Sequence, residues 1–160
     1  MEIERKFLLP GLPDGVEPAA SAVLRQGYLV SGPDGSVRVR DADGAFTLTT
    51  KSGSGLAREE TEIAITAEQF EQLWPATEGR RVEKHRHRIP AGALTYELDV
   101  FAGSLAGLSL VEVEFSSMAE AAAFVPPEWF GPEVTDDARY TNASLARDGL
   151  PDPADGYPLS

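Results

Sequence analysis

The sequence lacks cysteine, is poor in basic residues and has no long apolar run. Without cysteine among its 160 residues, disulfides, iron–sulfur clusters and cysteine nucleophiles are excluded. Lys and Arg total 14 against 26 Asp and Glu, and the resulting net charge of −12 argues against general binding to nucleic acid or an anionic membrane. No stretch of about 18 apolar residues occurs, and the first ten residues bear charges where a secretory signal is apolar. We therefore expect a cytoplasmic protein.

Alternation of apolar and polar residues dominates the chain and predicts strands. The Asp43-Gly44 pair, set between two such segments, indicates a two-residue hairpin turn. Turns are also indicated by Pro33-Asp34-Gly35 and Pro90-Ala91-Gly92, so we expect neighbouring strands to be antiparallel. The eight predicted strands cover residues 2–9, 24–30, 36–41, 46–52, 58–64, 81–89, 93–101 and 108–115.

Helix signals are fewer. Capping boxes are formed by Thr66 with Gln69 and by Ser117 with Glu120, and a short helix over Asn142–Arg147 would bury a leucine. Many strands and few helices favour an α+β, mostly β fold: a barrel or sandwich with helices at its ends or flank. We expect one domain over residues 1–150 and a flexible tail over 151–160.

The polar faces of the predicted strands are sorted by charge sign. Arg38 and Arg40 share one face, and Glu112 and Glu114 share another. Residues i and i+2 of a strand point to the same side, so such like charges repel each other unless another strand or a ligand compensates them. Because Arg and Lys bind phosphate, the pattern favours a polyanion site. The basic residues in these faces are Lys6, Arg38, Arg40, Lys51, Arg58, Lys84, Arg86 and Arg88.

A solvated outer sheet face is the alternative explanation for any one of these pairs. This explanation is less convincing when seven strands show the pattern together, because most of these strands have a clearly apolar opposite face. If the charged faces point into a closed barrel, they line a wet tunnel, and helices or a partner subunit must cover the apolar outside. A homodimer is then expected wherever apolar exterior stays uncovered. Arg5, opposite Glu4 on its strand, is expected to be solvated.

An ordered series of motifs resembles a known family. The series begins with Glu2-Ile3-Glu4-Arg5-Lys6, an ExExK sequence. It continues with QGYL (26–29), VRVR (37–40), TTK ending at Lys51, REETE (58–62), KHR (84–86), YELDVF (96–101), LVEVEF (110–115) and RYTN (139–142). Together these motifs resemble the CYTH domains, the triphosphate tunnel metalloenzymes, over about residues 2–145. The resemblance implies an eight-stranded antiparallel tunnel, a linear triphosphate substrate and a divalent metal.

Roles for individual residues follow from the resemblance and from their chemistry. The phosphate cradle is expected to be Lys6, Arg38, Arg40, Lys51, Arg58, Lys84 and Arg86. Hard carboxylate oxygens suit Mg²⁺ or Mn²⁺, and the resemblance gives Glu2, Glu4 and Glu114 as the first metal ligands. A second acidic group, which could hold another metal, position water or pair with arginine, consists of Glu60, Glu62, Asp99 and Glu112.

The expected reaction is attack of water on a terminal phosphorus of tripolyphosphate, releasing orthophosphate and pyrophosphate. The resemblance suggests Lys84, with Tyr28, as the group that takes the proton from water, and Glu62 is the rival base. Thiamine triphosphatase, adenylate cyclase and a passive polyphosphate or nucleotide binder are the alternative functions. A passive binder gains nothing from carboxylates beside its phosphates, so the acidic residues argue against it.

Overall fold

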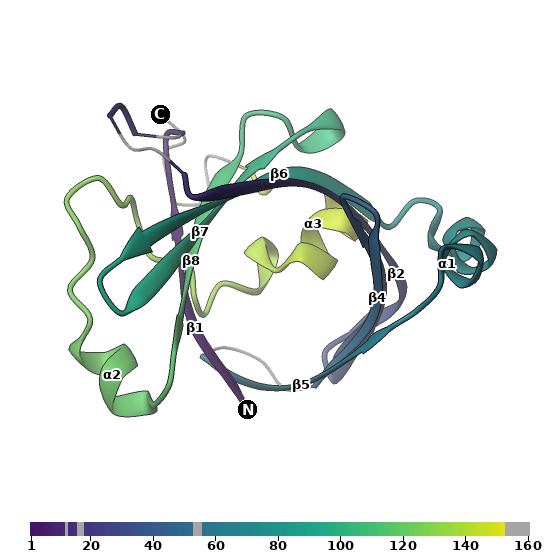
Figure 1. The fold of residues 1–160 in the computed structure, drawn as a ribbon, viewed down its shortest axis with the longest axis horizontal. Helices are drawn as coiled ribbons and strands as arrows, with labels where there is room; N and C mark the ends of the chain where they lie inside the picture. The colour runs from purple at the N-terminus through teal and green to yellow at the C-terminus, as the bar shows by residue number, and fades with distance from the viewer. Residues whose placement is uncertain (12, 16–17, 53–55, 153–160) are drawn as a thin grey trace.

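Eight antiparallel strands close into a barrel with the neighbour order β1-β5-β4-β3-β2-β6-β7-β8 (Figure 1). This arrangement is seen in a computed structural model that describes residues 1–11, 13–15, 18–52 and 56–152. The predicted eight-stranded antiparallel barrel is therefore confirmed. The strands are β1 (Glu2–Leu8), β2 (Ala20–Gly32), β3 (Gly35–Ala42), β4 (Ala45–Ser52), β5 (Ala57–Ala64), β6 (Arg81–Ala91), β7 (Leu94–Phe101) and β8 (Ser109–Phe115).

Turn chemistry sets the hairpin register. Asp43 and Gly44 both have positive φ, 49° and 89°, as a type I′ turn requires.

The strand β2 begins at Ala20, four residues before the predicted start. Residues 20–23 contain two alanines and a serine, so they show little alternation, and their strand conformation comes from pairing with β6, for example Ala20 with Arg88.

The barrel closes through a short seam between β1 and β5. Two residue pairs of the register join these strands, Glu2 with Arg58 and Ile3 with Ala57. A backbone hydrogen bond from Glu4 N to Leu56 O, 3.1 Å long, extends the seam. The opposite edge of β1 pairs with β8 over six residues, so β1 is held mainly from that side.

The outside of β1, β7 and β8 is apolar and covered. Helix α2 (Met118–Ala123) and the segment after it lie over this face, outside the ring of strands in Figure 1. Phe124, Trp129 and Phe130 pack there against Phe7 and Tyr96. Burial of large aromatic rings is a major stabilising contribution in a domain of this size. Ser117 caps α2 by accepting from Glu120 N at 3.1 Å, as predicted.

A second helical segment covers the other side of the barrel. It comprises α1 (Ala67–Leu73) and the 3₁₀ turn η1 (Trp74–Thr77). The predicted capping box at Thr66 and Gln69 is present in both directions. Phe70 is fully buried and stacks on Trp74 at a ring-centroid distance of 5.1 Å. Two further 3₁₀ turns are η2 (Gly103–Leu105) and η3 (Ala138–Tyr140).

The C-terminal helix α3 (Asn142–Asp148) closes one end of the barrel and is seen within the ring of strands in Figure 1. Leu145, buried as predicted, packs with Leu8, Val82 and Phe101. The interior therefore has an apolar zone against α3, and the charged zone occupies the rest. Most of the predicted tail, residues 153–160, lies outside the described residues.

Arg5 does not behave as expected. Its guanidinium donates to both carboxylate oxygens of Glu133, at 2.9 and 2.7 Å. It also donates to the carbonyl oxygens of Ala121 and Phe124, at 2.9 and 3.0 Å. The prediction of a solvated side chain is wrong, because the segment after α2 folds back over β1, which alternation within one strand does not show. Arg5 thereby fastens this segment to the barrel.

Candidate active site

The barrel encloses a cavity of about 200 Å³ whose lining is almost entirely charged or polar. Seven basic and seven acidic side chains line it, together with Tyr28, Ser36 and three residues at the start of α3. The basic set is Lys6, Arg38, Arg40, Lys51, Arg58, Arg86 and Arg88, and the acidic set is Glu2, Glu4, Glu60, Glu62, Glu97, Glu112 and Glu114. The prediction that the charged strand faces point inward is thus confirmed.

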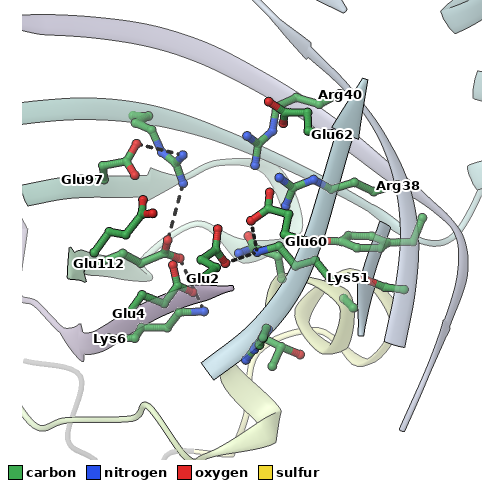
Figure 2. Close-up of a pocket in the computed structure, with 18 of the residues that line it drawn as sticks. Glu2, Glu4, Lys6, Arg38, Arg40, Lys51, Glu60, Glu62, Glu97 and Glu112 are labelled. Carbon is green, nitrogen blue, oxygen red and sulfur yellow. Dashed lines mark hydrogen bonds and ion pairs between the residues drawn. The ribbon is translucent and has the colours of Figure 1, made fainter. Parts of the chain in front are cut away.

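Two opposite walls of the cavity differ in their main charge, although Lys6 lies on the first and Glu62 on the second (Figure 2). Glu2 and Glu4 from β1 lie with Glu112 from β8 on one side, and Arg38 and Arg40 from β3 lie on the other. Strand alternation produces this division, because every second residue of β1, β3 and β8 faces inward. The cavity can therefore hold cations against one wall and an anion against the other.

The acidic wall has carboxylates that repel one another. Glu4 and Glu114 are directly paired residues of β1 and β8. Burial, together with the nearby Glu112 carboxylate, raises the pKa of Glu4 to about 7. Burial and a hydrogen bond shared with Glu60 raise the pKa of Glu2, and burial also raises that of Glu114. These three carboxylates thus lack sufficient positive charge around them.

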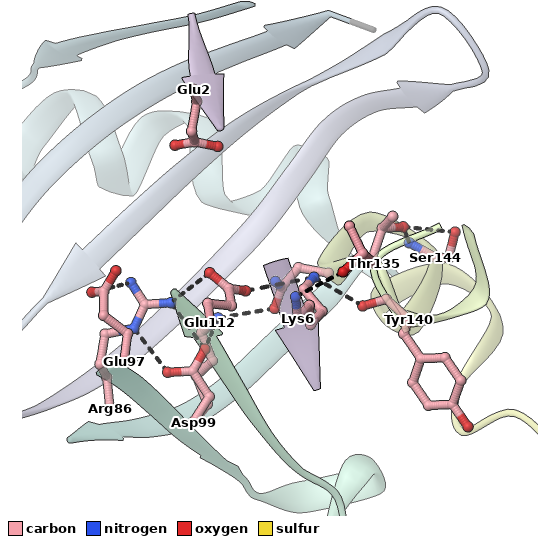
Figure 3. A network of polar contacts seen from close by, with 12 residues as sticks. Glu2, Lys6, Arg86, Glu97, Asp99, Glu112, Thr135, Tyr140 and Ser144 are labelled. Atoms are coloured by element: carbon pink, nitrogen blue, oxygen red, sulfur yellow. Dashed lines mark hydrogen bonds and ion pairs between the residues drawn. The ribbon is translucent and has the colours of Figure 1, made fainter. Parts of the chain in front are cut away.

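Glu112 differs from them because it is surrounded by cations (Figure 3). Its Oε1 lies 3.5 Å from Lys6 Nζ, and its Oε2 lies 3.9 Å from a guanidinium nitrogen of Arg86. Burial alone would raise the pKa of Glu112, but Lys6 and Arg86 hold it well below the usual range. Lys6 also donates to the carbonyl of Tyr140 at 3.2 Å, which ties the cavity to the C-terminal segment.

The basic wall has a buried hydrogen-bond donor that no described residue satisfies. Arg38 is buried, and its Nε is the buried side-chain nitrogen without a hydrogen-bond partner among the described residues. Burial and the neighbouring Arg38 lower the pKa of Arg40 to about 9. An uncompensated buried guanidinium is costly, so both arginines favour an anion in the cavity.

Lys51 lies between the two walls, and Glu62 lies beside the arginines of the basic wall (Figure 2). Lys51 Nζ lies 3.1 Å from Glu2 Oε1 and 4.0 Å from Glu60 Oε2. Burial and Arg38 would lower the pKa of Lys51, but the carboxylates around it raise it overall. Glu62 accepts a hydrogen bond from Thr49 at 3.1 Å and reaches the cavity from β5.

Two of the predicted site residues lie behind the cavity wall. Lys84 and Asp99 have side chains that are 0% and 1% exposed, and their Nζ and Oδ2 atoms lie 2.8 Å apart. Asp99 also binds Arg86 through both oxygens, at 2.8 and 2.9 Å. Burial lowers the pKa of Lys84 to about 7, although Asp99 opposes the shift. A metal role for Asp99 remains a prediction, and its contacts favour charge compensation of two cations instead.

Asn142, Thr141, Glu97 and Gln26 join the site without having been among the predicted site residues. Asn142 accepts from Lys84 Nζ at 3.0 Å and lines the cavity with Thr141. Glu97 accepts from Arg86 at 3.1 Å. Gln26 is fully buried and bonds two cavity residues. Its place two residues from Tyr28 on one strand face was the signal available in the sequence.

A divalent cation fits the acidic wall. No metal site is preformed in the described part of the chain, since no three His, Asp or Glu side chains cluster closely enough there. However, Glu2, Glu4 and Glu114 supply only hard oxygen donors, and their raised pKa values show that positive charge beside them is favourable. These residues therefore suit Mg²⁺ or Mn²⁺ better than a thiophilic metal.

Comparison with known proteins agrees with this geometry. A family model of the CYTH domain matches residues 1–126. The chain belongs to the CYTH family. Triphosphate tunnel enzymes of this family depend on divalent metal in general.

Several relatives of this CYTH chain span nearly its whole length. It is 55% identical over 148 residues to the inorganic triphosphatase of Nitrosomonas europaea, covering 91% of this chain and 96% of the relative. It is 40% identical over 149 residues to the inorganic triphosphatase of Acetivibrio thermocellus, covering 91% and 93%. The crystal structure of the inorganic triphosphatase NE1496 is 49% identical and superimposes with a TM-score of 0.70 over 95% of this chain and 97% of that one.

Proposed function

We propose that this protein is an inorganic triphosphatase, which hydrolyses tripolyphosphate to pyrophosphate and orthophosphate. The observation that bears most on the proposal is the enclosed cavity with opposed basic and acidic walls. The names of the relatives at 55% and 40% identity support it. We take residues 1–150 as the single domain that performs the reaction.

The lining favours an inorganic substrate over a nucleotide or thiamine triphosphate. Tyr28 is the one aromatic side chain among the described lining residues, and it is 2% exposed. Adenine and thiazolium rings bind best against exposed aromatic or apolar surfaces, which this cavity does not offer in the part of the chain described. A linear chain of phosphates, which needs only charge and hydrogen-bond donors, matches the lining better.

Charge balance supports a role for divalent metal. The seven cations and seven carboxylates of the lining cancel, whereas tripolyphosphate has about four to five negative charges near neutral pH. Glu2, Glu4 and Glu114 would hold Mg²⁺ or Mn²⁺, with Glu60 or Glu112 for another ion. When bound, the metal supplies Lewis-acid stabilisation of the phosphate oxygens.

The basic wall performs the rest of the substrate binding. Arg38 and Arg40 would hold phosphate oxygens through paired N–H groups, and Lys51 and Arg58 would contact the chain from the neighbouring strands. In the transition state these same donors stabilise the charge on the transferred phosphoryl group and on the leaving pyrophosphate. The strands that bear these side chains are hydrogen-bonded to one another, which fixes the backbone positions from which the side chains reach the substrate.

Removal of the proton from the attacking water is assigned to Lys84, with Glu62 as the rival. A lysine whose pKa is about 7 is partly neutral near neutral pH and can accept a proton. Lys84 Nζ lies behind the cavity wall, ion-paired with Asp99 and bonded to Asn142, and must leave both to do so, whereas Glu62 lines the cavity. Comparing Lys84→Met with Glu62→Gln at saturating substrate distinguishes them, because loss of the base lowers kcat with little change in KM.

The reaction is tested by ³¹P NMR of tripolyphosphate incubated with the protein and Mg²⁺. Equal amounts of orthophosphate and pyrophosphate are expected, with none formed from pyrophosphate alone. Recovery of intact tripolyphosphate, with calorimetry showing that it binds, would instead make the protein a passive polyphosphate binder.

Cellular location and assembly are proposals of the same kind. No helix among the described residues is long and apolar enough to cross a membrane. We propose a cytoplasmic protein with a small-molecule triphosphate as its ligand, and neither nucleic acid nor membrane as a partner. A homodimer is proposed because Val23, Val30 and Ile63 remain more than half exposed on the barrel exterior. Light scattering tests this assembly.

A further inference from the structure

A buried glutamine on β2 has hydrogen bonds to two residues of the cavity. Gln26 is 0% exposed and does not itself line the cavity. Its Oε1 accepts from Arg40 Nε at 2.9 Å, and its Nε2 donates to the Tyr28 hydroxyl at 3.2 Å. Both Arg40 and Tyr28 line the cavity. A fully buried amide that uses both its ends in this way is fixed in orientation.

The direction of these bonds follows from the chemistry of the three groups. A guanidinium can only donate, so the amide oxygen of Gln26 must face Arg40. The amide nitrogen must then face Tyr28, and the phenolic oxygen must accept. Gln26 is the partner of this hydroxyl among the described residues, so the hydroxyl hydrogen is available to an acceptor in the cavity. Tyr28 is thereby oriented as a donor.

The neutrality of Gln26 matters for Arg40. A carboxylate at this position would pair with the guanidinium and cancel one positive charge of the basic wall. The amide instead occupies only the Nε–H and leaves the terminal nitrogens of Arg40 for the cavity. Strand register supports the arrangement, because Gln26 lies directly opposite Arg40 and Tyr28 lies opposite Arg38 on β3.

We propose that Gln26 is a positioning residue that makes the Tyr28 hydroxyl a hydrogen-bond donor to the bound triphosphate and orients Arg40 without neutralising it. The proposal rests on the triphosphatase function proposed above. Tyr28 then donates to a phosphate oxygen, in the ground state or as charge develops, and does not act as the base. Its contribution to kcat depends on Gln26, and the contribution of Arg40 to KM depends on the same amide.

The test compares Gln26→Leu and Gln26→Glu for tripolyphosphate hydrolysis with saturating Mg²⁺. Leu removes both hydrogen bonds, so KM is expected to rise and kcat to fall, each by about tenfold or more. Glu is the closer isostere, yet it is expected to be the worse variant, because it neutralises Arg40 and accepts the Tyr28 hydrogen. A packing role alone predicts the reverse order. Gln72→Leu, on the exposed face of α1, is the matched control and should behave as wild type.

A double-mutant cycle with Tyr28→Phe completes the test. In the Tyr28→Phe background, Gln26→Leu should lower kcat by a clearly smaller factor than it does in the wild type, while its effect on KM through Arg40 persists. Wild-type kinetics of Gln26→Leu, or an equal loss of kcat in both backgrounds, would overturn the proposal. If thermal unfolding shows that Gln26→Glu does not fold, the double-mutant cycle by itself tests the proposal. Failure of the wild-type protein to hydrolyse tripolyphosphate would instead refute the function on which this inference rests.

Discussion

At the scale of single residues, the carboxylates of the acidic wall are expected to destabilise the metal-free protein, although they provide the proposed metal ligands. Burial and Glu112 raise the pKa of Glu4 from 4.5 to about 7, so the folded state holds this proton more tightly than the unfolded state. As pH rises from 4.5 through 7, the unfolded state releases the proton first, and the folded state is progressively destabilised. Without metal, Glu4 therefore destabilises the protein above about pH 7.

Glu4→Gln should stabilise the metal-free protein at pH 8 and abolish metal-dependent hydrolysis. The expected gain is about 1–3 kcal/mol in free energy of unfolding, measured by urea denaturation in chelator, and it should vanish at pH 4. In the wild type, the apparent metal affinity should weaken as pH falls below about 7, because proton and metal compete for Glu4. Glu128→Gln, at an exposed position, is the control. Full activity of Glu4→Gln would contradict the metal assignment.

For the basic wall, the prediction that corresponds to Glu4 concerns Arg38. Its buried Nε has no partner within the described residues, and it lies close enough to Arg40 to lower the pKa of that group. Arg38→Ala should raise KM for tripolyphosphate by about ten- to a hundredfold, while the melting temperature stays the same or rises. Arg38→Lys should recover part of the lost affinity. An unchanged KM in the alanine variant would show that this guanidinium does not contact substrate.

Asp99 should behave differently from the proposed metal ligands. It compensates Lys84 and Arg86 in a fully buried network, and removing one partner of such a network leaves uncompensated charge. Asp99→Asn should therefore lower the free energy of unfolding by about 3–5 kcal/mol, whereas Glu114→Gln should lose activity without this loss of stability. Denaturation of both variants in chelator measures the difference. A stable, inactive Asp99→Asn would favour a metal role after all.

At the scale of elements, the strands were predictable and the connections between distant elements were not. Alternation in the sequence predicted all eight strands within about four residues. The reason is that one face of each barrel strand points inward and the other outward, so the two faces differ in polarity along the strand. It also predicted which charges face inward. Contacts from the C-terminal segment, such as Asn142 with Lys84 and Glu133 with Arg5, join residues more than fifty positions apart. No local pattern contains them.

The close approach of η1 to β2 provides a prediction about stability. A Cβ on Gly27 would clash with the side chain of Thr77, whose Oγ1 accepts from Arg81 and donates to the Trp74 carbonyl. Gly27→Ala should therefore displace η1 and lower the free energy of unfolding by about 1–3 kcal/mol. Gly32→Ala, on the same strand with open space around it, is the matched control. Equal melting temperatures of the two variants would show that η1 moves at no cost.

At the scale of the whole molecule, charge is distributed unevenly. The chain has a net charge of −12, yet the cavity lining is balanced. The excess acidity therefore lies outside the tunnel, where it favours solubility. Composition alone argues against a polyanion ligand, and only the ordered placement of cations on strand faces predicts one. The family comparison then narrows that polyanion to a triphosphate.

Metal-dependent hydrolysis of tripolyphosphate is tested by initial rates of phosphate release from tripolyphosphate, ATP and thiamine triphosphate, each with Mg²⁺, Mn²⁺ or chelator. We expect rapid release from tripolyphosphate with metal, none with chelator, and rates from ATP and thiamine triphosphate lower by at least about a hundredfold. Hydrolysis in chelator, or a preference for either organic triphosphate, would contradict it.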